Sequence, residues 1–129
     1  MSTVQGTIAG AIPAWVTDTY RSVDHLDVAG FAAHLTDDVE FRFGNAPATT
    51  GKDAVREGLT QFFGAIAGMK HNFREVWEAG DDAVLVIDVD YTRLDGDVVT
   101  VPVVTRVHRR DGLTDSMQIF IDVSPALPG

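Results

Sequence analysis

An apolar segment near the end of the chain, residues 117–123, carries a carboxylate at Asp122. An ionised aspartate in apolar surroundings costs several kcal/mol unless it is paired, hydrogen-bonded or protonated. Desolvation raises the pKa of such a carboxyl group toward neutral pH, where it can exchange protons with a substrate. Two further groups with suitable chemistry, Asp90 and His71, lie in alternating segments upstream. These residue types indicate general acid/base catalysis.

Hairpin turns determine which side chains share a face of a sheet. Turns centred on 80–81, 95–96 and 111–112 predict one row across the sheet, made by His71, Asp90, Val101 and Asp122. We therefore predict Asp122, Asp90 and His71 as the catalytic residues of an apolar pocket. The predicted substrate-binding residues are Asp88, Phe73, Trp77, Val101 and Phe120 on that face, with Trp15 and Tyr20 as core aromatics at the pocket mouth.

The elements that must position these groups follow from the hydrophobic period. Residues 1–10 predict a flexible tail and residues 11–129 a single domain. A helical period predicts a first helix from Pro13 to Asp24, a short second helix capped by Asp27, and a third from Asp53, after a strand over 39–43. Four alternating segments follow, at 70–79, 82–94, 97–109 and 113–123. This order predicts an α+β fold in which three N-terminal helices pack on a curved, mainly antiparallel sheet that encloses the pocket.

Composition limits the possible partners. The chain has 129 residues, no cysteine and a formal net charge of −9, which opposes nucleic-acid binding and excludes disulfides. No apolar run is long enough to span a membrane. The first twenty residues contain no Lys or Arg, and Gly10 and Pro13 interrupt their apolar run, so we expect no signal peptide and a cytoplasmic protein. His71, Asp90 and Asp122 are too widely spread for a metal site. Residues 82–94 and 97–107 are apolar on both faces, which predicts a homodimer formed through the sheet.

Four motifs resemble those of one family: TDDVEF at 36–41, TGKDAVREGL at 50–59, VTVPVVTRVHRRDGL at 99–113 and FIDVSP at 120–125. Together with the element order, they resemble the SnoaL-like branch of the NTF2-like superfamily. The resemblance implies a cone-shaped fold with a deep apolar pocket and dimerisation through the sheet. In the polyketide cyclases of this branch a last-strand carboxylate acts as the general acid/base, and Asp122 matches that position.

The resemblance implies a cofactor-independent enzyme that cyclises or isomerises a small, largely apolar molecule. An epoxide hydrolase of the limonene type is the first alternative, with Asp90 as its second aspartate, although Asp88 stands where that family has an arginine. Catalysis by a histidine and an aspartate, as in scytalone dehydratase, is compatible with the composition. Ketosteroid isomerase fits less well, because Phe43, Thr19 and Val104 stand near its functional positions. A non-catalytic binding protein or structural dimer of the same fold completes the alternatives.

Overall fold

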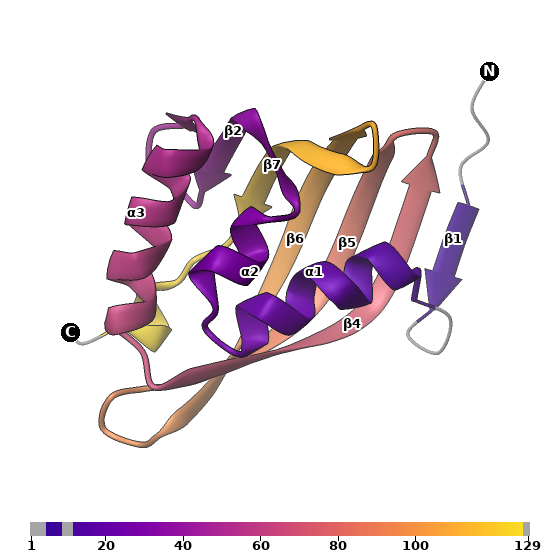
Figure 1. The fold of residues 1–129 in the computed structure, drawn as a ribbon. Helices are drawn as coiled ribbons and strands as arrows, with labels where there is room; N and C mark the ends of the chain where they lie inside the picture. The colour runs from indigo at the N-terminus through magenta and orange to yellow at the C-terminus, as the bar shows by residue number, and fades with distance from the viewer. Residues whose placement is uncertain (1–4, 9–11, 128–129) are drawn as a thin grey trace.

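The chain folds into one seven-stranded sheet with three helices over one of its faces (Figure 1). The computed structural model of the protein describes residues 5–8 and 12–127. In chain order the elements are β1 (Gln5–Ile8), α1 (Ala14–Asp24), α2 (Val28–Ala32), β2 (Leu35–Phe43), β3 (Thr49–Thr50), α3 (Lys52–Gly64), β4 (Gly68–Ala79), β5 (Asp82–Thr92), β6 (Val98–Arg110) and β7 (Leu113–Phe120), followed by a 3-10 turn over Ser124–Ala126. The strand order is β1-β4-β5-β6-β7-β2-β3, and β2 pairs with β7 in parallel while the other neighbours are antiparallel. The predicted α+β class with a mainly antiparallel sheet is confirmed.

The N-terminal region differs from its prediction. Residues 1–10 were expected to form a flexible tail, but Gln5–Ile8 pairs with Glu75–Glu78 as the edge strand of the sheet. The prediction is therefore wrong for these four residues. The remaining residues of that stretch lie outside the described part of the chain.

Helix positions follow the predicted apolar spacing. In α1, Val16, Tyr20 and Val23 are buried at intervals of four and three residues, which places them on one helical face. The Asp27 carboxylate accepts a hydrogen bond from the Gly30 N–H at 2.9 Å and caps α2, as predicted. Within the described residues, no helix combines the length and apolar character needed to cross a membrane.

The hairpin register differs from the prediction by one residue where it matters most. A bulge at Arg74 shifts β4 against β5, so that His71 lies opposite Val89 instead of Asp90. In the next hairpin Asp90 lies opposite Thr100, and Val101 lies opposite Val89. Because neighbouring residues of a strand point to opposite faces, His71 and Asp90 lie on different sides of the sheet. The predicted row is therefore wrong.

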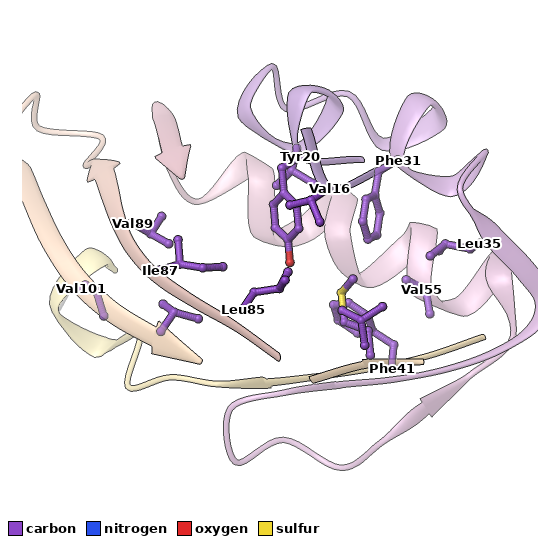
Figure 2. Packing of buried hydrophobic residues seen from close by; sticks show 14 of the residues in the cluster. Val16, Tyr20, Phe31, Leu35, Phe41, Val55, Leu85, Ile87, Val89 and Val101 are labelled. Carbon is purple, nitrogen blue, oxygen red and sulfur yellow. The ribbon is translucent and has the colours of Figure 1, made fainter. Parts of the chain in front are cut away.

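The core lies between the helices and the inner face of the sheet (Figure 2). Tyr20 and Phe31 reach down from the helices, and Leu85, Ile87 and Val89 reach up from β5 to meet them. Burial of such side chains stabilises the folded chain by about 1.5–3 kcal/mol each relative to an exposed position. The core therefore fixes α1 against the sheet, and Asp24 at the end of the helix contacts His71 of β4.

The outer face of the sheet keeps several apolar side chains exposed. Trp77 is 42% and Phe120 is 52% exposed, and Val84 and Val104 of the intervening strands are also exposed. The register joins these residues into two neighbouring rows across β4, β5, β6 and β7. Contiguous apolar surface of this kind is typical of an interaction face.

Candidate functional site

One histidine on the inner face forms an ion-pair geometry with a carboxylate of α1. Nδ1 of His71 lies 2.6 Å from Oδ1 of Asp24, and the backbone N–H of His71 donates to the same carboxylate at 3.1 and 3.2 Å. The His71 side chain is only 8% exposed, whereas that of Asp24 is 26% exposed. The histidine is therefore held in the interior by a carboxylate that reaches solvent.

The position of Asp24 is unusual for an acidic residue. It is the last residue of α1, where the helix dipole disfavours a negative charge. The three contacts with His71 compensate this cost, because they include a short hydrogen bond to a ring N–H. A carboxylate can only accept, so in the neutral ring the proton lies on Nδ1 and the lone pair on Nε2. Nε2 makes no hydrogen bond to the described residues.

A tyrosine one turn earlier in α1 lies beside the histidine. The ring centres of Tyr20 and His71 are 4.6 Å apart, and Phe73 packs edge-on against Tyr20 at 5.0 Å. Figure 2 shows the Tyr20 hydroxyl directed into the core toward Leu85. No described residue has hydrogen-bond geometry to this buried hydroxyl.

Burial also determines the protonation state of this tyrosine. Desolvation raises the pKa of Tyr20 far above its usual value. The Thr105 hydroxyl is near enough to oppose this shift in part, although it lies outside hydrogen-bond geometry to the phenol. The phenol is therefore neutral at all ordinary pH values. A neutral phenol without a partner is a free hydrogen-bond donor inside the protein.

His71 and Tyr20 lie in the wall of an apolar cavity between the helices and the sheet. The cavity has a volume of about 40 Å³, which is room for very few water molecules. Its lining consists of Tyr20, Val23, Phe31, Phe41, Phe43, Leu59, Phe62, Phe63, Met69, His71, Val89, Tyr91, Val103, Thr105, Met117 and Ile119. An apolar wall with a few convergent polar groups is typical of a small-molecule site.

The same two residues also face the outside. With Asp24, Arg21 and Phe73 they line an open groove on the surface next to α1. His71 and Tyr20 therefore separate a polar outer groove from an apolar inner cavity. Asp24 connects the buried histidine to solvent, through which the pair can exchange protons.

Of the other predicted residues, Phe73 is near this site and Val101 is buried on the inner face of the sheet opposite Val89. Asp90 lies on the outer face, where its carboxylate accepts hydrogen bonds from Thr100 at 2.6 Å and Asn72 at 3.1 Å. These bonds hold the pKa of Asp90 below its usual value. The expectation that Asp90 would face His71 is wrong.

Asp122 does not face the cavity. The last strand, β7, ends at Phe120, three residues before the predicted end, so Asp122 lies in the loop that follows. Its exposed carboxylate accepts hydrogen bonds from the hydroxyl of Ser124 at 2.7 Å and from the Ser124 N–H at 3.1 Å. These bonds lower the pKa of Asp122, whereas catalysis near neutral pH required a raised one. The expectation of a buried carboxylate is therefore wrong.

The remaining predicted substrate-binding residues lie away from the cavity. Asp88, Trp77 and Phe120 are on the outer face, and Asp88 is 3.7 Å from the guanidinium of Arg74. Trp15 is half-buried in α1 with the Arg109 guanidinium 4.4 Å from its ring centre. No cluster that could hold a metal ion is present in residues 5–8 and 12–127.

Comparison with known proteins supports the fold. The model of the family described as SnoaL-like domain matches residues 16–116. Three solved structures are similar. TerC, crystallised with polyporic acid, has a TM-score of 0.75 and 24% identity over 86% of this chain and 91% of its own. A candidate SnoaL-like polyketide cyclase from Jannaschia sp. CCS1 has a TM-score of 0.72 and 19% identity over 89% of this chain and 93% of its own.

The third, an epoxide hydrolase of the LEH-like type from M. tuberculosis, has a TM-score of 0.73 and 15% identity over 87% of this chain and 83% of its own. Among curated protein sequences none matches significantly. At these identities the structural similarities concern the fold. The chemistry must be argued from the site.

Proposed function

This chain belongs to the family of SnoaL-like domains, and we propose that it is a cofactor-independent acid/base enzyme acting on a small, largely apolar molecule. The observation that carries the proposal is the contact of 2.6 Å between His71 and Asp24 in the wall of an apolar cavity. This geometry leaves one ring nitrogen available for proton transfer. General acid/base catalysis of this kind contributes about 10²- to 10⁴-fold to a rate.

In the proposed reaction His71 is the catalytic base and Asp24 positions it. Nε2 of His71 takes a proton from a carbon atom next to a substrate carbonyl. Asp24 holds the ring in the tautomer that exposes the Nε2 lone pair, and it stabilises the imidazolium that forms. Catalysis by a histidine and an aspartate, as in scytalone dehydratase, is one of the alternatives that the sequence leaves open, and the His71–Asp24 pair supports it.

Tyr20 is the proposed partner of the substrate oxygen. When the C–H bond breaks, its electron pair forms a C=C bond and the carbonyl electrons move to oxygen. The orphan hydroxyl of Tyr20 can donate a hydrogen bond to this oxyanion. In a substrate with a C=C bond beside the deprotonated carbon, the resulting dienolate takes the proton back from His71 at the far end of that C=C bond, and the C=C bond shifts. In a substrate with a second carbonyl group, the enolate carbon attacks that carbonyl carbon and closes a ring, and the alkoxide that forms takes the proton from the His71 imidazolium.

We test this function with 4-phenylbutan-2-one as a probe, by following the replacement of its hydrogens next to the carbonyl by deuterium in D₂O by NMR. We expect the wild type to accelerate the exchange and His71→Gln to lose about 10²-fold or more of that rate. His108→Gln is the matched control, because His108 also pairs with a carboxylate, Asp115, at 2.5 Å but does not line the cavity. Equal losses in both variants, or none, would contradict the proposal.

A non-catalytic structural protein of the same fold is the second candidate, and the small cavity of about 40 Å³ favours it over a binding protein. It predicts that the hydrogens of the probe do not exchange. Epoxide hydrolysis between Asp90 and Asp122 lacks support, because Asp90 is on the outer face and Asp122 is beyond β7.

We also propose that the outer face of the sheet pairs with a second copy of the chain. The exposed apolar side chains of Trp77, Val84, Val104 and Phe120 cross the middle of this face. A two-fold axis there would pack these side chains of one copy against the same side chains of the other. Phe120→Glu should then shift the mass measured by analytical ultracentrifugation from dimer to monomer, and a monomeric wild type would contradict the pairing.

A further inference from the structure

A second apolar hollow lies next to the inner cavity, between α3 and β2. The two spaces share the side chains of Phe43, Leu59 and Phe62, together with Phe41, as a common wall. The hollow has a volume of about 190 Å³, compared with about 40 Å³ for the inner cavity. We call it the α3 recess, and we call Phe43, Leu59 and Phe62 the partition.

The partition consists of side chains and not of backbone. The rings of Phe43 and Phe62 are 5.1 Å apart, and Phe62 packs edge-on against Tyr91 at 6.1 Å. Phe43, Leu59 and Phe62 are all half-buried. Side chains in such positions can change rotamer without unfolding an element.

The orphan hydroxyl of Tyr20 points to a ligand that places an oxygen atom in the inner cavity. The free space there is too small for the rest of any such molecule. The groove on the other side of His71 contains Arg21, Asp24 and His25, which disfavour an apolar chain. The α3 recess shares its wall with the inner cavity, and small or apolar side chains line it.

Gly58 provides a separate observation. It lies in the interior of α3, where glycine weakens a helix relative to alanine. A Cβ atom at this position would meet nothing within 4 Å, so close packing does not require glycine there. The absence of a side chain keeps the recess open, since Gly58 and Ala54 form part of its wall.

We propose that the α3 recess binds the apolar tail of the substrate, with Gly58 as the position that limits tail length. This inference rests on the proposed function and adds the class of substrate: an elongated carbonyl compound with its oxygen at Tyr20 and an unbranched or flat apolar tail. Opening of the partition is part of binding. The tail then passes between Phe43 and Phe62 and ends against α3.

The test uses a series of straight-chain ketones, from 2-pentanone to 2-undecanone, titrated into the full chain by calorimetry. In the wild type we expect the affinity to rise about four-fold for each added methylene group. Gly58→Leu fills the recess, so its affinity for 2-undecanone should fall by about ten-fold or more, while 2-pentanone binding changes by less than about two-fold. Gly64→Leu is the matched control, because Gly64 is in the same helix, has the same open surroundings and does not line the recess.

Three results would overturn the inference: no gain of affinity with chain length in the wild type, no loss in Gly58→Leu, or the same loss in Gly64→Leu. Circular dichroism of each variant confirms that it is folded. His71→Gln separates the two proposals, because it should abolish deuterium exchange and leave the dependence on chain length unchanged. If the wild type exchanges deuterium but its affinity does not rise with chain length, only the proposal of the α3 recess is contradicted. If the affinity rises with chain length but no deuterium exchange occurs, only the proposed catalysis is contradicted.

Discussion

Removal of the Tyr20 hydroxyl should make the protein more stable and less active. A buried donor without a partner costs about 1–3 kcal/mol, and the Tyr20 hydroxyl has no partner among the described residues. Tyr20→Phe keeps the ring and its contacts with His71 and Phe73. The free energy of unfolding should therefore rise by about 1–3 kcal/mol.

Urea denaturation measures this change. For an m value of about 1–3 kcal/mol per M, the unfolding midpoint should rise by roughly 1 M. In the same variant the rate of deuterium exchange into the ketone probe should fall by about 10²- to 10³-fold, as expected for the loss of a donor to an oxyanion. Opposite changes in stability and activity are typical of a polar group kept for function.

Tyr91→Phe is the control for this experiment. Tyr91 is buried in the same cavity wall, and burial raises its pKa too, but its hydroxyl is not among the fully buried polar atoms that lack a partner in the described part of the chain. We expect no stabilisation from its removal. If Tyr20→Phe loses stability by about 1 kcal/mol or more, the Tyr20 hydroxyl already has a partner in the free protein and the reasoning fails.

Three further predictions concern the surroundings of the site. Asp24→Asn should lower the free energy of unfolding by about 1–3 kcal/mol in urea titrations, because it weakens the short charge-assisted bond to His71; an unchanged midpoint would show that the pair contributes nothing. Gly58→Ala should raise that free energy by up to about 1 kcal/mol through helix propensity, and the terminal Gly64→Ala by less, with a loss at Gly58 as the contrary result. The hydrogen bond to Asp115 raises the pKa of His108, so the stability from this pair is complete below about pH 6.5 and disappears as the pH rises through the raised pKa. Thermal unfolding of wild type and His108→Gln across this range should show the difference between them shrinking with pH, and a constant difference would contradict it.

The sequence was sufficient for the class of fold and for most elements. The apolar spacing of α1, the Asp27 cap of α2 and the long alternating segments all correspond to observed elements. These features are local, because each depends on residues within one helix or one hairpin. The SnoaL-like family was predicted from the same motifs and is confirmed by the match over residues 16–116.

The site could be predicted only in part, because its geometry depends on single-residue shifts. The bulge at Arg74 reverses the faces of His71 and Asp90 relative to a regular hairpin, and no turn residue signals it. The end of β7 at Phe120 likewise takes Asp122 out of the sheet. His71 was predicted in a pocket, but its partner Asp24 is 47 residues away in the chain. An acidic residue at the C-terminal end of a helix was the one available signal for that partner.

The measurement that tests the central claim most directly is the tautomer of His71 in the neutral ring, read from long-range ¹H–¹⁵N NMR of histidine-labelled protein. The account predicts a proton on Nδ1, held by Asp24 at 2.6 Å, and a free lone pair on Nε2. The His108 ring, paired through Nδ1 with Asp115, gives an internal reference in the same spectrum. A proton on Nε2 and none on Nδ1 in neutral His71 would contradict the account, because the proposed base would then have no lone pair to accept a proton.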